Sequence, residues 1–221
     1  MLALDPQTGA LKWHYQFTPH DLHDWDATET PLLVDTPRKL LLQGNRNGFF
    51  YVLDRTNGKL LSKSPFVHGL AASEPTVAGA RACPSMDGAT NWMSTAFDPA
   101  KGLFFLMALE KCSIFSKSPE VWKAGESYYG GGARDVPGDK PRQYLRAIDL
   151  ATGNVAWEIP QPAGEESWGG VLATASGLVF YCDGSGAFAA VDSATGQRVW
   201  RFWTVPSPGE PAAATWVGRA I

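Results

Sequence analysis

The residues best suited to chemistry stand together in residues 18–26 of this 221-residue chain. This stretch contains two histidines, three aspartates and a tryptophan, between two segments that read as ordinary β structure. Loops carried by rigid β scaffolds are common positions for catalytic groups. One of the carboxylates could act as a general base or bind a hard cation. Asp26, the last residue of the stretch, is the leading candidate.

A structural interpretation of the same stretch remains open. Aspartates favour turns, and the histidines could simply lie on the surface. A zinc site is a weaker alternative, because the other histidines in the chain are His14 and His68.

Four further residues could act together with Asp26. Arg46 lies between two apolar runs, so its guanidinium either faces a cleft, where it would suit an anion or a carbonyl-bearing cofactor, or is solvated on a turn. Asn91 and Trp92 could supply a polar contact and an aromatic plate, and Trp168, which precedes two glycines, could supply a second plate. The alternative for both tryptophans is packing between repeats.

An internal repeat indicates which elements carry these residues. It reads Ala, apolar, Asp, two variable residues, Thr, Gly, three residues, Trp, and it occurs at 3–13, 147–157 and 190–200, with looser copies at 52–61 and 96–105. The aspartate can accept backbone N–H bonds in a turn and the glycine can adopt positive φ. The tryptophan can pack against the next repeat. A period in the forties predicts an all-β fold, a β-propeller of four-stranded antiparallel blades.

Two other β architectures fit this pattern less well. A β-sandwich would show turn signals without a long-range repeat, and a parallel β-helix would need a shorter period. The five copies predict an incomplete propeller of about four to five blades, arranged as an open arc. Residues 1–203 are expected to form this partial propeller domain. Residues 204–221 are rich in Pro, Ala and Gly and are expected to be an irregular tail.

Two connections in the expected propeller have recognisable features. Residues 40–53 read as a β-hairpin with Asn47–Gly48 at its turn. Residues 116–143 read as a long loop, of the kind that is usually functional or disordered.

Composition excludes several classes of protein. Hydrophobic residues make up 44% of the chain, which excludes a disordered protein. The net charge of −3 without a basic stripe argues against nucleic-acid binding. No apolar run approaches the roughly 20 residues of a transmembrane helix, and no signal peptide is recognisable. Because the chain begins within the first repeat, an N-terminal portion is expected to be missing.

The chain has three cysteines, Cys83, Cys112 and Cys182. An odd count fits either a reducing compartment or one disulfide with a free thiol, and counting alone slightly favours the reducing compartment.

The combination of motifs resembles the pyrroloquinoline quinone (PQQ)-dependent, or quinoprotein, alcohol dehydrogenases. The resemblance rests on the repeats, on residues 18–27 (Thr-Pro-His-Asp-Leu-His-Asp-Trp-Asp-Ala) and on residues 45–55 (Asn-Arg-Asn-Gly-Phe-Phe-Tyr-Val-Leu-Asp-Arg). It extends over about residues 1–203. It implies an eight-bladed propeller with PQQ and Ca²⁺ near its axis, of which this chain would supply roughly the C-terminal half.

The resemblance also implies roles for the candidate residues. Asp26 would be the general base in alcohol oxidation by hydride transfer to PQQ, and would approach the Ca²⁺. Arg46 would contact both the PQQ carbonyl oxygens and the base, and Asn91 and Trp92 would lie at the cofactor edge. Trp168 would provide a further contact. The connection from Asp26 to Arg46 is several residues shorter than is usual in the family.

The same resemblance makes further expectations about the whole protein. It implies a disulfide between Cys83 and Cys112, with Cys182 free, and hence the periplasm. No Cys-x-x-Cys-His haem motif is present, so a separate cytochrome would accept the electrons. The other Ca²⁺ ligands would lie upstream, in the missing N-terminal half, and the isolated chain is expected to be inactive. The alternatives are a non-catalytic β-propeller scaffold for protein interactions and a sugar or aldose dehydrogenase that uses the same cofactor.

Overall fold

The computed structural model describes residues 1–162, 167–203 and 215–216, and these residues form antiparallel sheets. Four of the sheets consist of β1 (Leu2–Leu4) and β2 (Leu11–His14); β3 (Leu32–Asp35), β4 (Lys39–Gly44), β5 (Phe49–Asp54) and β6 (Leu60–Pro65); β8 (Ala96–Asp98), β9 (Leu103–Glu110), β12 (Arg142–Asp149) and β13 (Val155–Pro160); and β14 (Val171–Ala173), β15 (Leu178–Cys182), β16 (Ala187–Asp192), β17 (Arg198–Trp203) and β18 (Thr215–Trp216). The fifth sheet consists of β7 (Ala80–Ala82), β10 (Ser113–Lys117) and β11 (Gly131–Asp135).

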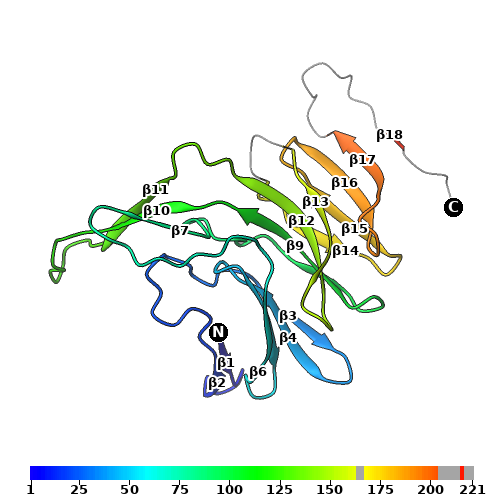
Figure 1. The fold of residues 1–221 in the computed structure, drawn as a ribbon. Helices are drawn as coiled ribbons and strands as arrows, with labels where there is room; N and C mark the ends of the chain where they lie inside the picture. The colour runs from blue at the N-terminus through cyan, green and yellow to red at the C-terminus, as the bar shows by residue number, and fades with distance from the viewer. Residues whose placement is uncertain (163–166, 204–214, 217–221) are drawn as a thin grey trace.

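The first four sheets lie side by side along an arc, while the β7–β10–β11 sheet extends away from it (Figure 1). This arrangement confirms the predicted incomplete propeller of antiparallel blades. Residues 215–216 of the expected tail form β18, which pairs with β17. The rest of residues 204–221 lies outside the described residues, so the division at residue 203 stays a prediction. The described residues contain no helix long and apolar enough to cross a membrane.

Two of the five sequence repeats belong to one blade. Asp98 lies at the β8–β9 turn and Asp149 at the β12–β13 turn, and all four strands form a single sheet. The other three aspartates, Asp5, Asp54 and Asp192, lie at the turns of three different sheets. In the described residues these turns therefore belong to four blades, within the predicted four to five. Two copies share a blade because any tight hairpin with an Asp and a Gly satisfies the same local turn chemistry.

The turn chemistry itself is as predicted. The Asp149 carboxylate accepts bonds from the backbone N–H of Thr152 at 2.7 Å and from its hydroxyl at 2.8 Å. These bonds hold the pKa of Asp149 below its ordinary value. Gly153 donates its N–H to the Asp149 carbonyl at 2.8 Å with φ of +74°. Asp5 and Asp192 make the corresponding bonds in their own turns.

The repeat tryptophans join successive blades. Trp13 donates its indole N–H to the carbonyl of Arg55, and Trp157 donates to the carbonyl of Ser193, each at 3.0 Å. Between the second and third blades, apolar side chains of β4 and β5 pack on those of β9. A second apolar cluster joins the third blade to the fourth. Each blade thus buries its apolar faces on its neighbours.

The predicted hairpin at residues 40–53 is formed by β4 and β5. Gly48 lies at the turn with φ of +88° and donates its N–H to Asn45. The long loop expected over residues 116–143 is partly wrong, because β11 lies within it and pairs with β10. The sequence did not indicate this strand because residues 130–132 are glycines, and glycine is depleted in strands.

Candidate active site

The candidate residues occupy equivalent places in successive blades. Asp26 precedes β3, Asn91 and Trp92 precede β8, and Trp168 precedes β14, so each lies just before the first strand of its blade. The segments contact each other. The Thr28 hydroxyl donates to the Asn91 side-chain oxygen at 3.2 Å, and the N–H of Val171 donates to the Ser94 carbonyl at 2.9 Å. The repeat thus brings these residues into one region.

Asp21 organises the loop that carries Asp26. Its carboxylate accepts the backbone N–H groups of His23 at 2.9 Å and Trp25 at 2.7 Å. The buried His23 ring stacks on the Trp25 ring, and the Trp25 indole N–H donates to the Ser85 carbonyl at 2.9 Å. These three side chains therefore have structural roles: Asp21 forms a turn, as the structural interpretation expected, whereas His23 is buried and not on the surface. His20 and Asp24 adopt positive φ in the same loop.

Asp26 lines a cleft of about 750 Å³. Its side chain is exposed and has no hydrogen bond or ion pair within the described ranges. Apolar side chains of Leu22, Met86 and Phe115 form part of the cleft wall, and Tyr129 lies at the start of the Gly130–Gly132 stretch on its far side. The cleft is thus large enough for a small organic molecule beside a free carboxylate.

Arg46 contacts a residue of this cleft, although it is not one of the lining residues itself. Its side chain packs over Gly88, where an added Cβ would lie 2.7 Å from the Cβ and Cγ of Arg46. Its guanidinium donates to the carbonyl of Met86, a residue that lines the cleft. In the described part of the chain, no ion pair joins Arg46 to Asp26. Arg46 thus contacts one residue of the cleft that Asp26 lines, and the contact between Arg46 and the base that the resemblance implied is not among the hydrogen bonds and ion pairs of the described residues.

Glu29 is a buried carboxyl group under the influence of Arg46 that sequence reasoning missed. It is 3% exposed, and burial raises its pKa to about 8, although the positive charge of Arg46 acts in the opposite direction. The Gln43 side chain donates to the Glu29 backbone carbonyl at 3.1 Å and approaches its carboxyl group at 3.5 Å. Nothing in the sequence distinguishes Glu29 from a solvated loop glutamate except its closeness to Asp26.

Asn91, Trp92 and Trp168 form a second group. The Asn91 amide donates to the Asp87 carbonyl at 2.9 Å, and its oxygen accepts the backbone N–H of Trp92 at 2.9 Å. The rings of Trp92 and Trp168 lie 5.2 Å apart, and both remain partly exposed. Two bonds between Gln143 and the backbone of Ser167, at 2.7 and 2.8 Å, fix the segment that carries Trp168.

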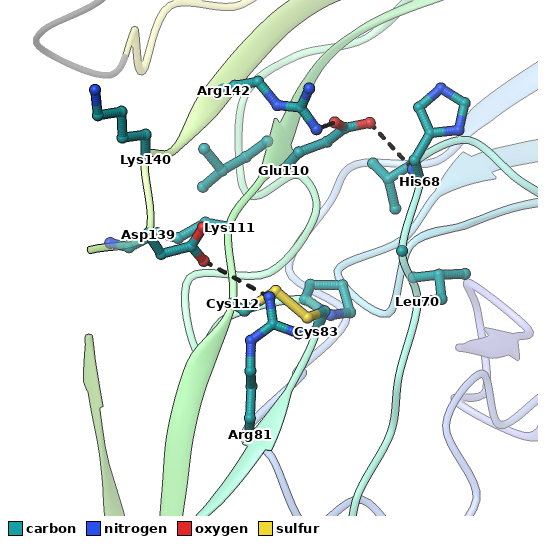
Figure 2. Close-up of a pocket in the computed structure, with 14 residues that line it drawn as sticks. His68, Leu70, Arg81, Cys83, Glu110, Lys111, Cys112, Asp139, Lys140 and Arg142 are labelled. Atoms are coloured by element: carbon teal, nitrogen blue, oxygen red, sulfur yellow. Dashed lines mark hydrogen bonds and ion pairs between the residues drawn. A yellow bond between two sulfur atoms is a disulfide. The ribbon is translucent and has the colours of Figure 1, made fainter. Parts of the chain in front are cut away.

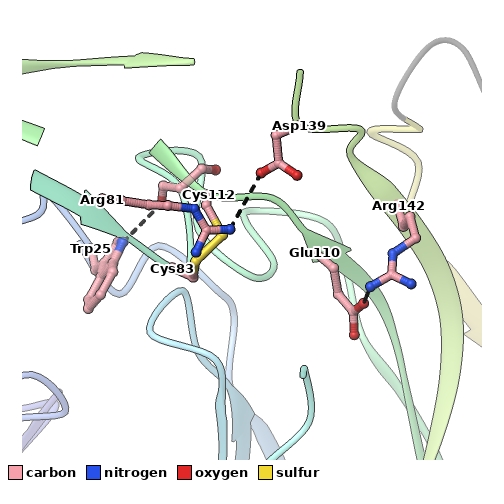
Figure 3. Close-up of a disulfide and its surroundings, with 8 residues drawn as sticks. Trp25, Arg81, Cys83, Glu110, Cys112, Asp139 and Arg142 are labelled. Carbon is pink, nitrogen blue, oxygen red and sulfur yellow. Dashed lines mark hydrogen bonds and ion pairs between the residues drawn. A yellow bond between two sulfur atoms is a disulfide. The ribbon is translucent and has the colours of Figure 1, made fainter. Parts of the chain in front are cut away.

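A smaller cavity of about 200 Å³ lies beside the Cys83–Cys112 disulfide (Figure 2). Charged side chains surround it, and several form pairs, including Arg142 with Glu110 at 2.9 Å and Arg81 with Asp139 at 4.0 Å (Figure 3). The disulfide confirms the pairing that the resemblance implied and contradicts the expectation from counting. Cys182 is free and exposed.

Comparison with known proteins connects this geometry to a family. Residues 1–65 match the family model described as glucose/ethanol/alcohol dehydrogenase, beta-propeller domain, and residues 141–213 match that of outer membrane protein assembly factor BamB. The quinohemoprotein alcohol dehydrogenase ADH IIB of Pseudomonas putida is 36% identical over 91% of this chain and 32% of its own length. The quinoprotein alcohol dehydrogenase PedH of Pseudomonas putida is 34% identical over 92% of this chain and 38% of its own length.

Solved structures agree with the sequence matches. The quinohemoprotein alcohol dehydrogenase of Comamonas testosteroni superposes with a TM-score of 0.80 and 30% identity, over 93% of this chain and 35% of that one. The enzyme ADHIIG of Pseudomonas putida HK5 superposes with a TM-score of 0.81 and 28% identity, over the same shares of the two chains. Over most of its length, this chain is similar to part of the quinoprotein alcohol dehydrogenases. It spans about a third of the length of the curated relatives that it matches.

The described residues of this chain fit a flat cofactor that carries carbonyl groups. Trp92 and Trp168 offer a partly exposed aromatic surface. Two buried donors, the side-chain nitrogen of Asn45 and the Nε of Arg46, have no partner in the described part of the chain. Carbonyl oxygens would satisfy such donors.

The same residues do not build a metal site. In residues 1–162, 167–203 and 215–216, no group of three or more His, Cys, Asp or Glu residues could hold a metal ion.

Proposed function

We propose that the protein to which this chain contributes oxidises alcohols to aldehydes with PQQ, and that Asp26 is its general base. One observation carries this assignment. Asp26 presents a carboxylate without a partner in the described residues to a cleft of about 750 Å³, and Arg46 donates to the carbonyl of Met86, which also lines this cleft. A base needs a free acceptor atom in a cavity that admits substrate.

Each candidate residue has a distinct role in this proposal. Oxidation of a primary alcohol breaks its O–H and C–H bonds, and the Asp26 carboxylate accepts the hydroxyl proton. PQQ, when bound, accepts the hydride. Arg46 places positive charge near the carbonyl oxygens of the cofactor, where negative charge develops. Trp92 and Trp168 support its flat ring system, and Asn91 contacts its edge.

Further parts of the proposal extend beyond this chain. Asp26 would supply one ligand to a Ca²⁺ ion, and the described residues contain no group of three or more His, Cys, Asp or Glu residues that could hold it. We therefore assign no catalytic step to the ion here. A c-type cytochrome would accept the electrons. The disulfide suits an oxidising compartment such as the periplasm.

The test is turnover by the complete propeller that contains this segment, loaded with PQQ and Ca²⁺. Reduction of an artificial dye by small primary alcohols is measured for the wild-type protein, for Asp26→Asn and for Asp24→Asn, an exposed carboxylate on the same loop. Asp26→Asn is expected to lower kcat by about 10²–10⁴-fold with PQQ still bound, whereas Asp24→Asn retains activity. Full turnover by Asp26→Asn would refute the assignment. The 221-residue chain by itself is expected to be inactive.

A non-catalytic scaffold is the second candidate function, because residues 141–213 match the BamB family model. That match lies outside the region of Asp26, Arg46 and Asn91. Failure of the complete propeller to bind PQQ would favour this second candidate.

A further inference from the structure

Two complementary polar atoms at the proposed site are buried and unpaired. Oε1 of Glu29 and Nε of Arg46 have no hydrogen-bond partner in the described part of the chain. Buried polar atoms almost always have partners. One of these atoms is an acceptor and the other is a charged donor, so each could satisfy the other.

Glu29 and Arg46 already influence each other. Burial raises the pKa of Glu29 to about 8, and the charge and backbone N–H of Arg46 both act to lower it. Near neutral pH the carboxyl group therefore keeps its proton and attracts the guanidinium only weakly. Gln43 adds a contact to the carboxyl group at 3.5 Å, which is too long for a strong bond.

The position of Arg46 matters for the cleft. The guanidinium donates to the carbonyl of Met86, which lines the cleft that contains Asp26. The arginine side chain also packs against Gly88. A turn of the guanidinium that brings Nε to Oε1 of Glu29 and takes Nη2 off Met86 would move positive charge away from Met86.

We propose that Glu29 is a positioning residue for Arg46. As a neutral acid it leaves the guanidinium on Met86, and as a carboxylate it draws the guanidinium into an ion pair with Oε1. The alkaline form then offers less positive charge to a ligand in the cleft. The significance of this switch for catalysis rests on the proposed function, but the rearrangement itself does not.

The other charged groups near Glu29 have partners or face elsewhere. In the loop that holds Met86, Asp87 pairs with Lys111 at 3.0 Å. In the loop of Glu29 itself, His23 contacts the Ser73 carbonyl at 2.9 Å and Asp26 lines the cleft. On β4, Gln43 is neutral. Arg46 is thus the charged group whose field acts on Glu29.

The rearrangement is tested without cofactor, by nuclear magnetic resonance of the arginine Nε–H groups between pH 6 and pH 10. The Arg46 signal, assigned with Arg46→Lys, is expected to shift with an inflection near pH 8. Glu29→Gln, which has nearly the same shape and does not ionise, should abolish the shift. Glu74→Gln, an exposed glutamate that lines the cleft, should preserve it. An Arg46 signal that does not move, or that moves equally in Glu29→Gln, would overturn the proposal.

A second measurement covers the case in which Glu29→Gln does not fold. Infrared spectra of the wild-type protein should then show the C=O stretch of a neutral buried carboxyl group that disappears near pH 8. A wild-type protein in which this band is absent at neutral pH would also overturn the proposal.

The pH profile of turnover separates this inference from the proposed function. In the cofactor-loaded complete propeller, kcat/KM should fall about tenfold for each pH unit above the inflection, and Glu29→Gln should lack this fall. An Arg46 shift in a protein without turnover would refute the proposed function and leave the switch intact. Turnover without the Arg46 shift would refute the switch and leave the proposed function intact.

Discussion

The indole rings of Trp92 and Trp168 lie 5.2 Å apart, centroid to centroid, with their planes inclined by 37°, although they precede strands of different blades. Trp92 is 63% exposed and Trp168 is 41% exposed. Large rings are normally buried when packing is their only role. A partly exposed pair on rigid segments is therefore better explained as a surface for a flat ligand.

This pair predicts a measurable effect on cofactor binding. Trp92→Ala should weaken PQQ binding to the complete propeller roughly three- to tenfold, since aromatic pairs are worth about 0.5–1.5 kcal/mol. It should also remove the coupled Trp–Trp signal from the circular dichroism spectrum. Trp122→Ala is the control, because Trp122 is similarly exposed and joins no aromatic pair in the described residues. Equal effects of the two variants would argue against a ligand role for Trp92.

Packing between blades predicts an unusual sensitivity at Gly58. A Cβ at this position would lie 2.6 Å from Cε3 of Trp13, whereas a Cβ at Gly9 would meet nothing within 4 Å. The two glycines have φ of +74° and +71°, so both substitutions carry the same backbone strain. Gly58→Ala should therefore lower the free energy of unfolding by about 1–3 kcal/mol more than Gly9→Ala. Urea denaturation measures the difference, and equal losses would show that Trp13 moves freely.

Arg146 is expected to be essential for stability. Its side chain is fully buried and bonds to Glu110 at 2.8 Å, Glu158 at 2.9 Å and the Phe66 carbonyl at 2.7 Å. Arg146→Met should cost about 3–5 kcal/mol, because Glu110 would remain buried without its main partner. Thermal and chemical denaturation measure this loss.

The Arg146 pair also predicts a pH dependence of stability. Burial acts to raise the pKa of Glu110, but the His68 N–H and the charges of Arg146 and Arg142 outweigh burial and hold the pKa below its ordinary value. The stabilisation is thus present above the ordinary pKa and is lost as pH falls through the lowered one. Arg146→Met should show a weaker loss in this acidic range. Parallel pH profiles for the two proteins would contradict this explanation.

The raised pKa of Glu29 predicts a pH dependence of stability with the opposite sign. Its pKa is about 8 in the folded chain and 4.5 ordinarily, so the folded state binds more protons between these values. Stability should therefore fall as pH rises through this range, by at most about 1.4 kcal/mol per pH unit. Denaturation of the wild-type chain and Glu29→Gln at several pH values tests this. The free energy of unfolding of the wild type should fall relative to that of Glu29→Gln toward pH 8. A constant difference between the two proteins would show that Glu29 is ionised when folded.

The disulfide is expected to stabilise the segment that it closes. Cys83 and Cys112 close a loop with a sequence separation of 29. By chain entropy, their replacement by alanine should cost about 2–4 kcal/mol. A reducing agent should destabilise the wild type equally and leave the double variant unchanged. Cys182→Ala, at the free and exposed cysteine, is the control.

Several features followed from the sequence because they depend on neighbouring residues. Asp149 with Gly153, and Asn47 with Gly48, produce turns through local hydrogen bonds and positive φ. The repeat spacing then indicated stacked blades, and Trp13 and Trp157 lie against the next repeat as expected. The resemblance identified the family, which the comparisons support.

Other features depended on contacts between residues far apart in the chain. The assignment of Asp98 and Asp149 to one blade is a matter of strand pairing between β9 and β12. The structural role of Asp21 and the burial of Glu29 likewise arise from how the loop packs on other segments.

The sequence by itself thus determined the turns, the all-β repeat and the set of candidate residues, since these are properties of short stretches. Tertiary structure decided which carboxylates are free, which are neutral and which tryptophans meet. Burial and partners are set by the whole surroundings of a side chain, and a carboxyl group such as that of Glu29 changes its pKa only when other parts of the chain exclude water from it.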